Sequence, residues 1–127
     1  MLEDQVKRLA QDPNFGALTT LLPDGQPMTQ VMWVDADDEH ILINTEVHRQ
    51  KYQNVTHDPR VAISVIDRDN PYHYAEVRGE VVGEVRGSEA REHIDRLSQK
   101  YTGGAYGMPI TSERVILRIA PRRQRVQ

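Results

Sequence analysis

The amino-acid sequence predicts a mainly β protein: a small, mostly antiparallel barrel with short helices at its periphery. Strand-like segments outnumber helical ones, in the order helix, strand, strand, strand, helix, strand, strand, helix, strand. A parallel α/β sheet would instead alternate strands with helices. Gly79, Gly83 and Gly87 recur in the longest strand-like segment. Glycines inside strands are typical of the bulges and bends that close a barrel.

Composition narrows the class of protein. The chain has 127 residues, 38% of them hydrophobic, which predicts a single domain over residues 1–127 with one core. The net charge of −3 disfavours a dedicated nucleic-acid-binding protein. Cysteine is absent, which excludes disulfides, thiolate metal sites and cysteine nucleophiles. We expect a cytoplasmic protein, because the sequence shows neither an export signal nor a membrane-spanning apolar run.

The first half of the chain predicts a helix, three strands and a second helix. Apolar residues at helical spacing predict a helix over 2–11, ended by Pro13. The strand-like segments 15–22 and 28–34 flank the turn sequence at 23–26 and predict a hairpin. An acidic loop over 35–39 precedes a third strand over 40–45. The short helix predicted over 49–57 ends at Asp58-Pro59.

The second half predicts two strands, the longest helix and a final strand. The β-branched segment 60–67 predicts a strand, joined by the turn 68–71 to a long or bent strand over 72–86. Ser88 is expected to cap a helix whose apolar face extends to Tyr101. A Gly-rich loop over 101–109 leads to the last strand, 113–119. The basic C-terminal tail, 120–127, is expected to fray.

The usual catalytic and phosphate-binding motifs are absent, so the candidate site depends on less specific patterns. The five histidines lack metal-ligand spacing, and we expect no metal site. Arg49 and Lys51 lie where a predicted strand leads into a predicted helix. Such a helix start and its cations favour a phosphate or a carboxylate. The same pattern also fits a solvated helix face whose charge Glu46 neutralises.

Two other segments place polar side chains beside apolar ones. Gln30 lies among aliphatic and sulfur-containing residues of the strand 28–34, with Trp33 close by. A planar ring fits against such a strand, with Gln30 and backbone groups at its edge; a solvent-facing Gln30 is the alternative. His73, in the aromatic group 72–74, is the histidine best placed to meet a ligand. A hydrogen-bonded structural histidine would show the same pattern.

Taken together, these segments resemble the pyridoxamine-5′-phosphate-oxidase-like split β-barrel superfamily, and within it most closely the small F420-dependent (deazaflavin) oxidoreductases. The matching segments follow the family's order and spacing over nearly the whole chain: 14–21, 23–25, 31–34, 43–45, 49–54, 58–62 and 69–79. The resemblance implies an antiparallel split β-barrel with short flanking helices. It also implies a homodimer whose two cofactor sites lie at the subunit interface.

The resemblance further implies which residues bind the cofactor. Residues of the strand 28–34 would line the ring, and the basic element after the strand 40–45 would hold the phosphate. The implied cofactor-binding residues are Met28, Thr29, Gln30, Val31, Met32, Asn44, Thr45, Arg49, Gln50, Lys51 and Asn54. Asp67 and His73 fall near the implied substrate pocket, and no residue is identified as catalytic.

The resulting hypothesis is an oxidoreductase that transfers hydride between reduced F420 and a small conjugated organic substrate, with neither nucleic-acid nor membrane partners. The cofactor supplies such chemistry, and the protein supplies orientation and water exclusion. Gln50 stands where flavin-dependent relatives often carry a second basic residue, which disfavours FMN. Two alternatives remain: an FMN-dependent enzyme of the same fold, and a protein that binds a cofactor or a tetrapyrrole without turnover.

Overall fold

Seven strands form one continuous sheet in the computed structural model, which describes residues 1–127. The strands are β1 (Phe15–Leu21), β2 (Pro27–Trp33), β3 (Asp35–Ala36), β4 (Ile41–Glu46), β5 (Arg60–Ile66), β6 (Tyr74–Arg86) and β7 (Arg114–Val126). Their order across the sheet is β2-β1-β5-β6-β7-β4-β3, and all neighbours are antiparallel. The predicted mainly β, antiparallel fold is confirmed, and β2 and β3 are the edges of the sheet.

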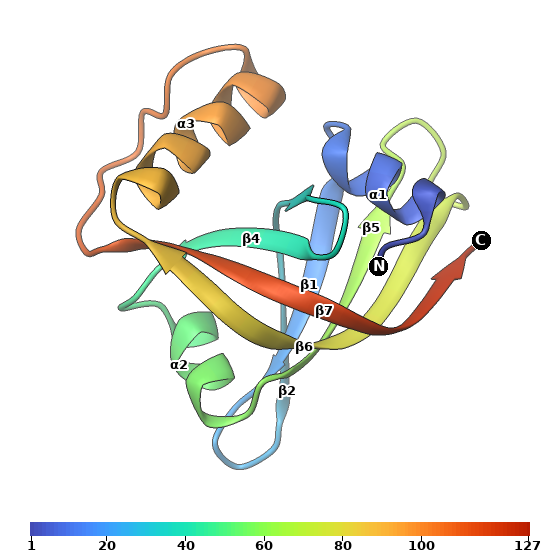
Figure 1. The fold of residues 1–127 in the computed structure, drawn as a ribbon, viewed down its shortest axis with the longest axis horizontal. Coiled ribbons are helices and arrows are strands. Elements are labelled where there is room, and N and C mark those ends of the chain that lie inside the picture. Colours follow the sequence, from blue (N-terminus) through green and yellow to red (C-terminus); the bar gives the residue numbers. More distant parts are fainter.

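Three helices lie around the curled sheet. α1 (Asp4–Gln11) and α3 (Ser88–Thr102) lie at opposite upper corners of Figure 1, and α2 (Gln50–His57) lies below them. The long strands β6 and β7 cross the molecule as a bent ribbon between these helices. α1 buries Val6, Leu9 and Ala10. No helix of this chain combines the length and the apolar composition that crossing a membrane requires.

Alternate residues of the strands build the core. In β1 and β5 every second residue is buried, because side chains of a strand point to opposite faces in turn. Within the core, Leu18 of β1 lies opposite Ile63 of β5. Ile41 and Ile43 of β4 belong to the same cluster of 19 buried residues. Each fully buried large aliphatic side chain contributes about 1.5–3 kcal/mol relative to exposure, so this cluster is the main stabilising feature.

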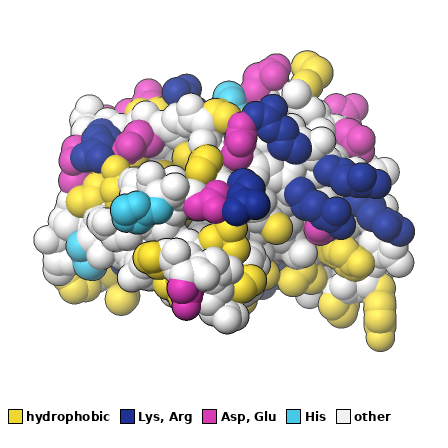
Figure 2. All heavy atoms as spheres, turned by 90° about the horizontal axis from the view of Figure 1, so that it is seen from below, with side chains coloured by type: hydrophobic (Ala, Val, Ile, Leu, Met, Phe, Trp, Pro, Cys, Tyr) yellow, Lys and Arg dark blue, Asp and Glu magenta, His cyan; other side chains and the backbone are white.

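The basic C-terminal segment does not fray, and the sequence-based expectation for 120–127 is wrong here. β7 continues to Val126 and remains paired with β6 from Ala75 onward. Opposite charges support this pairing, because Glu76 faces Arg125 in the register and Arg122 forms an ion pair with Glu80. Figure 2 shows Lys and Arg side chains gathered toward the end of the molecule where Figure 1 places the C-terminus.

Two smaller expectations also change. Ser88 begins α3 but does not cap it: the N-cap is Gly87 at φ 78°, and no side chain caps the helix. A backbone of that conformation is ordinary for glycine and strained for other residues. The acidic segment 35–39 contains the two-residue strand β3, since Asp35 and Ala36 pair with Leu42 and Ile41 of β4.

Gly79 lies at a bulge in the β6–β7 ribbon, and we expect Gly79→Ala to destabilise the protein by about 1–3 kcal/mol through overpacking. A Cβ at this position would lie 2.1 Å from the Ala120 carbonyl oxygen, so backbone would have to move. Urea unfolding measures the change. Gly107→Ala is the matched control, because a Cβ there meets no atom within 4 Å; equal midpoints for both variants would contradict the expectation.

Candidate functional site

A cavity of about 350 Å³ lies beside the edge strand β2, between the start of α2, the helix α3 and the α3–β7 loop. One part of its lining is apolar or aromatic and another is cationic. The lining residues are Phe15, Val31, Met32, Trp33, Asn44, Arg49, Lys51, Ile94, Leu97, Tyr106, Met108 and Arg114. A cavity with a flat apolar wall and a charged end suits a planar molecule that carries an anionic group.

Aromatic rings form the apolar wall. Trp33 stacks on Tyr101, with ring centroids 5.2 Å apart and an angle of 3° between the planes. Tyr106 meets Trp33 edge-on at 6.2 Å. The Val34 N–H donates to the Tyr101 hydroxyl at 3.0 Å, and that hydroxyl donates to the Asn14 carbonyl. Burial raises the pKa of Tyr101 to about 12, and the neutral phenol fixes the wall to the backbone at Val34 and Asn14.

Three cations form the other end of the cavity. Arg114 and Lys51 are only 4% and 9% exposed, whereas Arg49 is partly exposed. Burial and the charges of Arg49 and Arg114 lower the pKa of Lys51 to about 8. Lys51 has neither a carboxylate nor a hydrogen-bond partner within the chain. Most of the Lys51 side chain is withdrawn from solvent at the cavity, so an anion bound there would offset the cost of that desolvation.

Glu46 is the single carboxylate at this end, and it is 1% exposed. It accepts the backbone N–H groups of Thr111 and Ser112 at 2.8 and 2.7 Å. It also pairs with Arg114 at 3.3 Å and Arg49 at 3.2 Å. Burial opposes its ionisation, but these donors and cations outweigh burial and lower its pKa. One carboxylate against three cations leaves this end positive.

The alternation of β4 decides which predicted residues reach the cavity. Asn44 and Glu46 share one face of the strand, whereas Thr45 shares the core-facing side with Ile43. The Thr45 hydroxyl is buried and lacks a hydrogen-bond partner. Of the predicted cofactor-binding residues, the cavity lining contains Val31, Met32, Asn44, Arg49 and Lys51.

The remaining predicted residues lie outside the lining. Asn54 is fully buried; it donates to the Thr20 hydroxyl at 2.9 Å and accepts from Gln50 at 2.7 Å. Thr29 bonds to Thr19 across the β1–β2 pair at 2.7 Å. Met28 and Gln30 are also outside the lining; both belong to β2, the strand at the open edge of the sheet.

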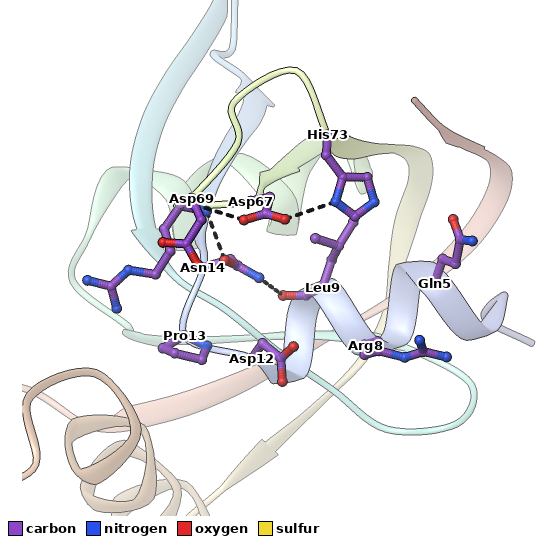
Figure 3. Close-up of a pocket in the computed structure, with 10 residues that line it drawn as sticks. Gln5, Arg8, Leu9, Asp12, Pro13, Asn14, Asp67, Asp69 and His73 are labelled. Atoms are coloured by element: carbon purple, nitrogen blue, oxygen red, sulfur yellow. Dashed lines mark hydrogen bonds and ion pairs between the residues drawn. The ribbon is translucent and has the colours of Figure 1, made fainter.

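Asp67 and His73 line a different cavity, of about 340 Å³, between α1 and the β5–β6 turn. Figure 3 shows His73 pointing at Asp67, with 3.0 Å between Nδ1 and Oδ2. The Asp67 N–H also donates to the His73 carbonyl, so the pair closes the turn. The two cavities share no lining residue. The structure therefore separates Asp67 and His73 from the cationic cavity.

Several lining residues were missed in the sequence. The sequence places Arg114 in the last predicted strand, 113–119, and Tyr106 and Met108 in the Gly-rich loop predicted over 101–109, without a functional role for any of them. An arginine at the start of an otherwise apolar strand was the available signal, because strand pairing places it beside Glu46. The guanidinium of Arg114 lies over the Tyr106 ring, 5.5 Å from its centroid.

The comparisons with known proteins cover nearly the whole chain. The family model described as pyridoxamine 5'-phosphate oxidase matches residues 2–127. The chain belongs to this family. The family's split β-barrel agrees with the curled seven-stranded sheet, so the predicted fold and the resemblance are both confirmed. None of the curated proteins matches the chain.

Solved structures of the same fold include one close in sequence. A structure named "F420 Reductase" is 35% identical, covers 98% of each chain and superposes with a TM-score of 0.83. A conserved hypothetical protein, Rv2991 from Mycobacterium tuberculosis, is 30% identical to this chain. The match covers 99% of this chain and 84% of the Rv2991 chain, and the two structures superpose with a TM-score of 0.73. A putative pyridoxamine 5'-phosphate oxidase from Listeria innocua is 20% identical. The match covers 93% of this chain and 90% of the Listeria chain at a TM-score of 0.69, and at this identity it supports the fold alone.

Proposed function

We propose that this member of the pyridoxamine 5'-phosphate oxidase family is an oxidoreductase that uses reduced F420 and passes hydride to a small conjugated organic substrate. The observation that carries the proposal is Lys51, which is mostly buried, has no hydrogen-bond or ion-pair partner in the chain, and lines the same end of an aromatic-walled cavity as Arg49 and Arg114. The 35% identity to a protein named F420 reductase supports the choice of cofactor.

The residues of the cavity fit a planar cofactor with a phosphate. Lys51 and Arg114 would hold the phosphate of the cofactor. Arg49, which is more exposed, would reach the part of the cofactor's anionic tail that extends toward solvent. Met32, Val31 and Trp33 would line the ring. Because β2 is an edge strand, its outer backbone groups have no partner strand and are available to the ring's polar edge. When bound, the cofactor supplies the hydride.

FMN is the second candidate, because the matching family model is named for pyridoxamine 5'-phosphate oxidase. Separate fluorescence titrations with F420 and FMN distinguish the candidates, followed by mixing reduced F420 with conjugated acceptors. Binding of F420 with acceptor-dependent oxidation supports the proposal. A yellow protein with a flavin spectrum would favour FMN instead. Binding of F420 without oxidation by any acceptor would leave a binding protein without turnover.

We propose further that the active form is a homodimer with the cofactor site at the subunit interface. Val31 is 70% exposed and Phe15 is 43% exposed at the cavity, an apolar surface that a second copy would cover. A stable dimer of this kind buries about 2,000 Å² or more. Light scattering at micromolar concentration should give twice the chain mass. A monomer that still binds F420 would contradict the interfacial site.

Gln30 tests the ring-binding role of β2. Its side chain is exposed on the edge strand, and loss of one neutral hydrogen bond predicts a drop of about 1 kcal/mol in F420 affinity for Gln30→Ala. Gln30→Trp should block the ring and lower affinity further. Titration of both variants, with circular dichroism to confirm folding, measures the effect. Unchanged affinity in both would show that Gln30 only faces solvent.

A further inference from the structure

A chain of hydrogen bonds links α3 to the cationic end of the cavity. Asp35 Oδ2 lies 2.9 Å from His93 Nε2, and His93 Nδ1 lies 3.0 Å from Asn44 Nδ2. The Arg114 Nε–H donates to Asn44 Oδ1 at 2.8 Å. Arg114 continues the chain to Glu46 at 3.3 Å. Its members come from β3, α3, β4 and β7, so one hydrogen-bond network joins these four elements.

The neighbours of Asn44 determine which way its amide points. Asn44 Nδ2 lies 2.9 Å from the Ala90 carbonyl oxygen, which only accepts hydrogen bonds. Asn44 Oδ1 faces the guanidinium of Arg114, which only donates. The second N–H of Asn44 therefore points at His93 Nδ1. That ring nitrogen must be an acceptor, so the ring is neutral and its proton lies on Nε2, donated to Asp35.

Both N–H groups of Asn44 are thus used inside the protein, and its oxygen holds Arg114. A proton added to His93 Nδ1 would face an Asn44 N–H. Turning the amide over would relieve that conflict but would place the NH₂ group against the Arg114 Nε–H. Because His93 is 1% and Arg114 4% exposed, solvent offers neither of them a ready replacement partner.

We propose that His93 is a positioning residue for the anion site. Its neutral ring holds Asn44, and through it Arg114, in the binding geometry. Protonation of Nδ1 breaks the contact of Asn44 with Arg114 Nε, which leaves Arg114 less well oriented and weakens anion binding. The identity of the anion rests on the proposed function. The coupling itself rests on the hydrogen-bond geometry. Asn44 acts in this scheme as the link to Arg114 rather than as a donor to the cofactor.

Other charged groups surround His93. Burial opposes ionisation of Asp35, but hydrogen bonds from His93 and the Ala36 N–H lower its pKa, with a further contribution from Lys100. Asp35 therefore stays a carboxylate that accepts the Nε2–H. The cavity beside His93 also contains Asp37, Glu89, Glu92, Arg96 and Arg118. Because these groups also respond to pH, the test compares two proteins that differ only at His93.

The first arm measures F420 affinity between about pH 5.5 and pH 8. His93→Asn places an amide oxygen near the position of Nδ1 and does not titrate, so it should bind like the natural protein at pH 8. At pH 5.5 the natural protein should bind about tenfold more weakly than His93→Asn, since a hydrogen bond to a charged group is lost. His93→Leu removes the acceptor and should weaken binding at both values. His57→Asn is the control, because His57 is exposed and outside the network.

The second arm needs no cofactor. Nitrogen NMR of the free protein should show His93 with its proton on Nε2 at pH 8 and an Arg114 Nε–H signal that moves between pH 8 and pH 5.5. In His93→Asn that signal should stay unchanged over the same pH range. Parallel affinity profiles for the two proteins, or a proton on Nδ1 at pH 8, would overturn the proposal. Failure to bind F420 at any pH would count against the proposed function, while the NMR result would still decide the coupling.

Discussion

Lys51→Ala is expected to lower the affinity for F420 by about 1.5–3 kcal/mol, the contribution of a hydrogen bond to a charged group. The reason is the position of the side chain: Lys51 is 9% exposed, its ammonium has no partner in the chain, and the charges of Arg49 and Arg114 act on it. Fluorescence titration measures the loss. Lys7→Ala is the matched control, because it removes the same charge from α1, where Lys7 pairs with Asp38.

The affinity should also depend on salt and on pH. Partly exposed ion pairs are screened over about 8–10 Å, so added salt should weaken binding more in the natural protein than in Lys51→Ala. Because the pKa of Lys51 is about 8 in the free protein, a bound anion would raise it. Affinity should therefore fall as the pH rises above 8, and Lys51→Arg should not show this fall. Equal affinities of the natural protein and Lys51→Ala at low and high salt would mean that Lys51 does not contact the anion.

Glu46→Ala is expected to destabilise the protein by about 3–5 kcal/mol, because it leaves a buried arginine without its counter-charge. Arg114 is 4% exposed, and the Thr111 and Ser112 N–H groups would lose their acceptor as well. Urea unfolding at neutral pH measures the change. Glu76→Ala removes a partly exposed pair with Arg78 and should cost less than about 1 kcal/mol.

The pH dependence gives Glu46 a second test. Its pKa is lowered in the folded protein, so its contribution to stability is present above the unfolded value of about 4.3 and is lost as the pH falls through the folded value. The stability difference between the natural protein and Glu46→Ala should therefore shrink in acid. A difference as small as that of Glu76→Ala at neutral pH would show that the buried cluster adds little.

The order of the elements could be predicted because their signals are local. Turn residues, β-branched runs and the amphipathic helix after Gly87 all lie within short segments. The end of β7 could not be predicted in this way. Its pairing with β6 joins residues about 40 to 50 positions apart, and the charges of Arg122 and Arg125 are offset by Glu80 and Glu76 across the ribbon.

The candidate site was predictable only in part, for a related reason. Arg49 and Lys51 gave a local charge signal, and the cavity contains both. The alternation of β4 was enough to separate Asn44 from Thr45, although proximity in sequence had grouped them. Arg114 comes from a strand about 65 residues away, and its role depends on non-local pairing with Glu46. The family resemblance implies Asp67 and His73 in the substrate pocket, whereas in the structure they bond to each other across the β5–β6 turn and line another cavity.

The stacked wall of the cavity gives this protein a built-in optical reporter. Trp33 is the single tryptophan of the chain, and it lies in the cavity lining, in contact with Tyr101. Its emission therefore comes from one place, and a chromophore that enters beside it should quench that emission by energy transfer. Occupancy of the site can be followed in unlabelled protein, with a colourless anion such as phosphate as the comparison. Quenching by a deazaflavin but not by phosphate would separate ring contact from charge contact within one titration.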